Sequence, residues 1–172
     1  MADLIPTSRP KPGHRSSWNA TPNAEELASK RRREKMFDEL KVYRDRALQD
    51  PTNLQTRYQY GVRLFRAELL DDAIPLFQEA RNDPKTRTMC NLYIGRCFYQ
   101  KAYYSQSIDI LQEAIETHET PDDELGKDLH YWLGRTYESD GKSEDALKIY
   151  GQIIQHRDVR KRMDALQEQN IV

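Results

Sequence analysis

The feature that most constrains this chain is a series of three glycines, Gly61, Gly95 and Gly134, each inside an aromatic-rich helical pattern. The first two glycines are 34 residues apart and the next two are 39 apart. A small residue follows each glycine after twelve positions, and a bulky one follows after sixteen. The small residues are Ala73, Ser107 and Ala146, and the bulky residues are Phe77, Leu111 and Tyr150.

Two helices can pack closely only where one of them lacks a side chain, so glycine and small residues mark the helix crossing and large residues fill the space around it. The spacing therefore predicts an all-α chain built from three consecutive pairs of antiparallel helices. The predicted repeats are 54–87, 88–121 and 127–160, separated before the third by a five-residue insertion, 122–126. We expect the insertion to lengthen the first helix of the third repeat, starting from Thr120 and Pro121.

The segments outside the repeats have different compositions. Residues 1–23 hold four of the eight prolines together with serines and basic residues, which predicts a disordered tail. Trp18 in this tail either packs loosely on the first helix or acts as a docking anchor, for a partner or for the protein's own groove. Residues 24–51 predict a capping helix left from a degenerate repeat, and 158–169 predict a C-terminal capping helix, because terminal repeats must cover an open core.

Composition limits the classes of function. The chain has 172 residues and a formal net charge of −1, which gives no reason to expect bulk attraction to nucleic acid or to acidic membranes. No run approaches eighteen apolar residues and the N-terminus lacks a secretion signal, so we expect a cytoplasmic protein without a membrane span. Cys90 and Cys97 lie about 10 Å apart along one predicted helix, too far for a disulfide bond. They are interpreted as buried small hydrophobic residues, with a redox or metal role as the alternative.

The only dense basic run is Lys30–Arg33. Acidic residues at helical spacing, including Glu26 and Glu34, favour a solvated helix face with ion pairs. The alternative is a contact with nucleic acid or another polyanion.

The sequence shows no residue pattern typical of a catalytic, metal-binding or phosphate-binding site. The four histidines are scattered and none forms a helical metal pair, and no glycine-rich phosphate loop occurs. Acidic pairs such as Asp71–Asp72 stand at predicted helix starts, where the helix dipole favours them. We therefore expect no catalytic residues, no metal, no cofactor, and no enzymatic activity.

The repeated motifs Tyr60-Gly61, Ile94-Gly95 and Leu133-Gly134, with their small and bulky followers, resemble tetratricopeptide repeats and cover about two thirds of the chain. The whole is similar to small bacterial tetratricopeptide proteins. Arg57, Asn91 and His130 stand where the family usually has tryptophan. The resemblance implies a right-handed superhelical solenoid of antiparallel helix pairs, with a concave face that binds a peptide or helix of a partner protein. It implies no chemistry.

The resemblance also implies which residues line that face: the second, fifth, ninth and twelfth positions of each repeat. These are Gln55, Tyr58, Val62 and Phe65, then Met89, Leu92, Arg96 and Tyr99, then Asp128, Tyr131, Arg135 and Glu138. Arg96 and Arg135 occupy equivalent positions beside tyrosines, which would suit a peptide bearing carboxylates and aromatic or apolar anchors. The alternative is that these residues pack and pair within the solenoid. Chaperone-docking members of the family clamp an acidic C-terminal tail with a set of Lys and Asn residues at inner positions. Tyr58, Val62 and Arg96 stand at such positions here, so that kind of partner is not expected.

The sequence thus predicts a non-enzymatic scaffold or adaptor with a protein or peptide partner and no small-molecule substrate. Two alternatives remain open: a nucleic-acid-associated protein that uses Lys30–Arg33, and a self-assembling structural protein.

Overall fold

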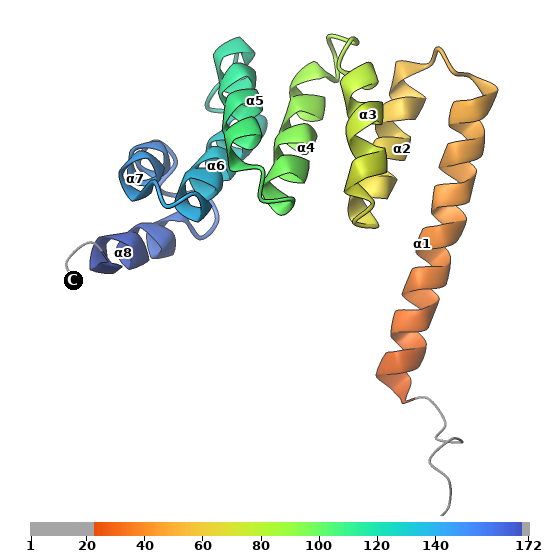
Figure 1. Ribbon diagram of the computed structural model, residues 1–172, viewed down its shortest axis with the longest axis horizontal. Helices are drawn as coiled ribbons and strands as arrows, with labels where there is room; N and C mark the ends of the chain where they lie inside the picture. Colours follow the sequence, from red (N-terminus) through yellow and green to blue (C-terminus); the bar gives the residue numbers. More distant parts are fainter. Residues whose placement is uncertain (1–22, 170–172) are drawn as a thin grey trace, which may run out of the picture. The chain divides into compact units, whose positions relative to one another are not determined.

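A computed structural model describes residues 23–169, and within them the secondary structure consists of α-helices and turns. In chain order the helices are α1 (Ala24–Gln49), α2 (Leu54–Arg66), α3 (Leu70–Ala80), α4 (Arg87–Gln100), α5 (Tyr104–Thr117), α6 (Glu124–Ser139), α7 (Ser143–Gly151) and α8 (Val159–Gln169), as labelled in Figure 1. The expected all-α class is confirmed. The chain divides into two units, residues 1–35 and 36–172. In the range described, every helix is too short or too polar to cross a bilayer.

Helix pairs in the second unit pack in sequence: α2 with α3, α4 with α5, and α6 with α7. At each crossing the repeat glycine faces the bulky residue sixteen positions later. A Cβ atom on Gly95 would lie 2.6 Å from Leu111 Cγ, and one on Gly134 would lie 2.4 Å from Tyr150 Cε1. Because Leu111 and Tyr150 are fully buried, these crossings leave no room for a methyl group.

The pairs are joined into a continuous stack by contacts between neighbours. α4 packs against α3 and also against α2, and α6 packs against α5 and also against α4. The first helices of the three pairs, α2, α4 and α6, therefore form one layer, called here the A-helix layer.

The start of α6 differs from the expectation that it begins at Thr120–Pro121. The helix begins at Glu124, and Asp123 is its N-cap, accepting a hydrogen bond from the Gly126 amide at 2.7 Å. The Thr120 hydroxyl donates to the Asp123 carboxylate at 2.7 Å. Thr120 thus supports the capping residue instead of being the cap, because the carboxylate is placed to accept from the first turn.

The two parts of α1 differ in their surroundings. Residues 24–35, in the first unit, are mostly polar, and all of them except the half-buried Ser29 are exposed. The helix starts with Asn23 Oδ1 accepting from the Glu26 amide at 2.8 Å. In the second unit, Leu40 is buried and Arg63 of α2 donates to the Tyr43 hydroxyl at 2.8 Å. The hypotheses for the N-terminal tail and its Trp18 fall outside the residues described.

The C-terminal helix α8 packs through an apolar side. Val159 and Leu166 are buried in a cluster with Tyr131, Ala146 and Tyr150. Val159 and Leu166 therefore form the apolar side through which α8 packs against α6 and α7.

Candidate functional site

The twelve residues expected to line the binding face all lie on the A-helix layer, but they differ in exposure. Four of them are buried, so their side chains mainly pack the interior: Val62, Phe65, Leu92 and Tyr131. Seven are half-buried: Tyr58, Met89, Arg96, Tyr99, Asp128, Arg135 and Glu138. Gln55 is exposed.

Arg135 is held by neighbouring tyrosines. Its guanidinium donates to the Tyr99 hydroxyl at 2.7 Å and to the Tyr131 hydroxyl at 3.3 Å. The Tyr131 hydroxyl in turn donates to the Asp158 carboxylate at 2.9 Å. Burial is the largest single influence and would lower the pKa of Arg135, but the hydrogen bond to Tyr131 and the electrostatic attraction of Tyr99 and Tyr131 together raise the pKa. The charge of Arg135 is therefore already stabilised within the protein.

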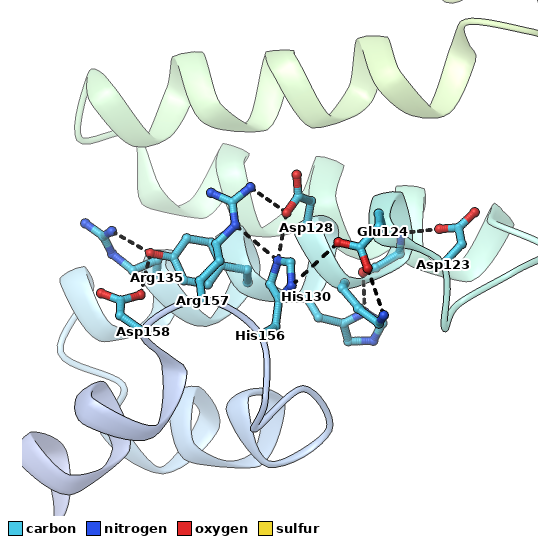
Figure 2. A network of polar contacts seen from close by, with 11 residues as sticks. Asp123, Glu124, Asp128, His130, Arg135, His156, Arg157 and Asp158 are labelled. Carbon is cyan, nitrogen blue, oxygen red and sulfur yellow. Dashed lines mark hydrogen bonds and ion pairs between the residues drawn. The ribbon is translucent and has the colours of Figure 1, made fainter.

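Asp128 belongs to a polar network between α6 and the α7–α8 connection (Figure 2). His156 Nε2 lies 2.8 Å from Asp128 Oδ1, and Arg157 Nη2 donates to the same oxygen at 2.6 Å. On the other side of the imidazole ring, Glu124 Oε2 lies 4.0 Å from His156 Nδ1. The carboxylate of Asp128 is thus occupied by contacts that hold the α7–α8 connection in place.

Glu138 is also paired within the chain. Its carboxylate accepts from Arg162 of α8 at 3.1 Å and from the Tyr150 hydroxyl at 2.7 Å. Burial and this hydrogen bond raise the pKa of Tyr150. Glu138 therefore attaches α8 to α6.

Arg96 has different surroundings. Its Cζ lies 4.6 Å from the ring centroids of both Phe65 and Trp132, and 5.4 Å from that of Tyr93. Among residues 23–169 it has no ion pair or hydrogen bond, and its Nε and the Trp132 Nε1 are buried donors without a partner. Burial lowers the pKa of Arg96. The ring faces attract this cation, but they do not replace a carboxylate or a hydrogen-bond acceptor.

Two residues of this cluster, Tyr93 and Trp132, were missed by sequence reasoning. They occupy the same repeat position, two residues before Gly95 and Gly134. An aromatic residue at one position in consecutive repeats is the signal that could have identified them, since equivalent positions on α4 and α6 lie on the same side of the layer.

A cavity with a volume of about 430 Å³ lies elsewhere in the described part of the chain, between the start of α6 and residues 152–157. On its wall, Lys127 pairs with Glu124 at 2.9 Å, and His156 and Arg157 contact Asp128. In the same part of the chain, no group of three or more His, Cys, Asp or Glu residues is arranged to hold a metal ion.

No protein-family model and no curated protein matches the sequence, whereas solved structures match the fold. The structure described as "Crystal structure of MamA" superposes with a TM-score of 0.68 and 21% identity, covering 88% of this chain and 86% of that one. A second, "Crystal structure of MamA protein", gives 0.66 and 22%, covering 82% and 76%. The structure described as "MamA RS-1 ArsTM double mutant" gives 0.68 and 15%, covering 84% and 82%.

MamA is a tetratricopeptide-repeat protein, and the match extends over most of the chain. This chain has the tetratricopeptide-repeat fold. The fold is typical of protein–protein interaction scaffolds and is generally non-catalytic. At these identities the likeness establishes the tetratricopeptide-repeat fold, while function must be argued from the residues of this chain.

Proposed function

We propose that the protein is a non-enzymatic scaffold or adaptor whose A-helix layer binds an acidic segment of a partner protein. The observation that carries the proposal is Arg96, a cation held between Phe65 and Trp132 that forms no ion pair among the residues described. A carboxylate from the partner would complete the site. Arg135, the equivalent residue in the next repeat, is supported by Tyr99 and Tyr131 and has a structural role in this proposal.

The Arg96 guanidinium is preorganised to bind a carboxylate. A guanidinium can form two parallel hydrogen bonds with one carboxylate, and such charge-assisted bonds are about twice as strong as neutral ones. The aromatic rings already restrict the arginine side chain, so little rotamer entropy remains to be lost on binding. Partial burial further strengthens the attraction by lowering the local dielectric constant. Removing one member of such a pair typically costs about 2–5 kcal/mol of binding free energy.

Apolar anchors would complete the contact. Tyr58 and Met89 are half-buried on α2 and α4. Tyr58 lies close to Phe77 and Tyr93, with ring centroids 6.2 Å apart in both cases. We therefore expect the partner segment to carry an apolar or aromatic residue near its acidic one, because buried aromatic contacts provide much of the energy of such interfaces.

A displayed peptide library tests the proposal, because it samples many combinations of acidic and apolar residues at once. Selection on the wild-type protein should enrich peptides with Asp or Glu at a fixed distance from an apolar residue. Arg96→Gln removes the charge but keeps a long polar side chain. It should lower the affinity for these peptides at least tenfold in isothermal titration calorimetry. Arg160→Gln, on an exposed arginine of α8, is the matched control and should bind normally. Equal binding by wild type and Arg96→Gln would exclude the assigned site.

A second candidate, self-association, is favoured by the apolar flank of α1. Phe37 and Leu48 are 60% and 69% exposed, and Phe37 borders a cavity of about 300 Å³ with Leu40, Tyr60 and Leu69. Exposed apolar groups at one end of a repeat stack are a common contact surface. Light scattering coupled to size exclusion should show a mass that rises with concentration and returns to that of a monomer in Phe37→Asp. A constant monomer mass would exclude this candidate.

A further inference from the structure

A small cavity lies between the C-terminal end of α3, the start of α4 and the end of α5. Its volume is about 280 Å³, and it is lined by Arg81, Asn82, Arg87, Asn91, Glu113 and Thr117. Asn91 is 1% exposed, and its Oδ1 is a buried acceptor without a hydrogen-bond donor. A buried polar atom without a partner is unfavourable, and such atoms are commonly satisfied by a bound ligand, ion or water.

The first repeat shows how the equivalent position is filled. Asn91 stands four residues before Gly95 and Glu113 eighteen residues after it; the matching residues around Gly61 are Arg57 and Glu79. Arg57 forms an ion pair with Glu79. Its Nε also donates to the Pro51 carbonyl at 2.7 Å. In the first repeat, therefore, a guanidinium bridges the two helices.

The second repeat has the carboxylate but not the guanidinium. Asn91 is too short to take the place of an arginine, and Glu113 has no ion pair among residues 23–169. In the third repeat the two equivalent positions leave no unpaired carboxylate. His130, at the position of Asn91, lies 2.8 Å from the Gly126 carbonyl through Nδ1, and Gln152 stands at the position of Glu113. The second repeat thus combines a cavity with two acceptors that have no cationic partner.

Two cations stand at the same cavity. Arg81 and Arg87 have no ion pair within the described range, although Arg87 Nε donates to the Arg81 carbonyl at 3.3 Å. The equivalent positions in the first repeat are Ala47 and Asn53, which carry no charge. A plain cation would be repelled by these arginines, whereas a ligand that also carries a carboxylate would be attracted.

We propose that this cavity binds a ligand of the arginine type, with a guanidinium and a carboxylate. The guanidinium takes the place that Arg57 fills in the first repeat and donates to Asn91 Oδ1 and the Glu113 carboxylate. The ligand's carboxylate pairs with Arg81 and Arg87. The site is independent of Arg96 and of the proposed partner-binding face.

Four probes separate the parts of this recognition: L-arginine, agmatine, which lacks the carboxylate, L-citrulline, which has a neutral urea group in place of the guanidinium, and inorganic phosphate. Binding is measured on the full chain by calorimetry and by ¹⁵N-edited NMR, where the Asn91 side-chain amide reports the location. L-Arginine should bind at least tenfold more tightly than the other three. A tripeptide ending in arginine distinguishes a partner's C-terminus from the free amino acid, and tighter binding of either one identifies the source of the ligand.

Four variants, one of them a control, test the assignment. Glu113→Gln should lower the affinity for L-arginine at least tenfold. Glu144→Gln, at an exposed position on α7, should leave that affinity unchanged. Asn91→Arg should abolish binding and raise the melting temperature without ligand, and this gain should disappear in Asn91→Arg/Glu113→Gln. Equal binding of citrulline or phosphate, full binding by Glu113→Gln, or no binding of any arginine compound at millimolar concentration would overturn the proposal.

Discussion

Gly95→Ala tests directly whether the helix crossing depends on a missing side chain. The new Cβ would lie 2.6 Å from Leu111 Cγ and 2.7 Å from its Cδ2. Ordinary carbon contacts need almost 1 Å more, and Leu111 is fully buried, so it cannot move into solvent. Gly151→Ala is the matched control, because nothing lies within 4 Å of a Cβ built at that exposed helical glycine.

The size of the effect follows from two opposing terms. Alanine gains about 1 kcal/mol over glycine in a helix interior. Overpacking a well-filled core costs about 1–3 kcal/mol, and the short contact places Gly95→Ala toward the upper end. We expect a net loss of about 1–2 kcal/mol, which lowers the melting temperature by roughly 5 °C for a domain of this size. Gly151→Ala gains helix propensity without overpacking and should be neutral or slightly stabilising.

Urea and thermal denaturation followed by circular dichroism provide the measurement. Leu111→Ala completes a double-mutant cycle: it costs about 2–5 kcal/mol by itself, but in its background Gly95→Ala should become stabilising, because the methyl group then enters the vacated space. If Gly95→Ala were as stable as Gly151→Ala, or if its effect did not change sign in the Leu111→Ala background, the steric account of the crossing would be wrong.

Three further predictions concern other parts of the structure. Hydrogen bonds from the Gly126 amide, His118 and Thr120 lower the pKa of Asp123 in the folded protein. The stabilisation from Asp123 is therefore complete above the unfolded pKa of about 3.9 and is lost as pH falls through the lower folded pKa. Asp123→Asn should reduce the acid dependence of the melting temperature below about pH 4. Ser107→Ala removes a 2.9 Å hydrogen bond to the Gly95 carbonyl, and denaturation should show a loss of about 1 kcal/mol. Burial raises the pKa of Cys90 to about 11 and of Cys97 to about 12, so both thiols should resist a disulfide reagent at pH 8 and react fully in denaturant.

Much of the fold could be predicted because the information was local and repeated. Gly95 and Leu111 are sixteen residues apart, one helical hairpin, and the same spacing returns around Gly61 and Gly134. The start of α6 was harder to predict, since Thr120 and Asp123 are both good capping residues and only the geometry of the turn selects between them.

The candidate site was less predictable. Arg96 and Arg135 occupy equivalent repeat positions, and the sequence treats them alike. Their difference depends on neighbours far away in the chain: Tyr99 lies 36 residues from Arg135 and accepts its hydrogen bond. Trp132 of the next repeat covers the Arg96 guanidinium instead of accepting a hydrogen bond from it.

The sequence by itself determined the helix pairs and their crossings, because a glycine opposite a bulky residue restricts packing wherever the two helices meet. Only the tertiary structure decided which charges remain without partners. Pairing depends on side chains from different repeats meeting within a few ångströms, and the spacing along one helix does not contain that information.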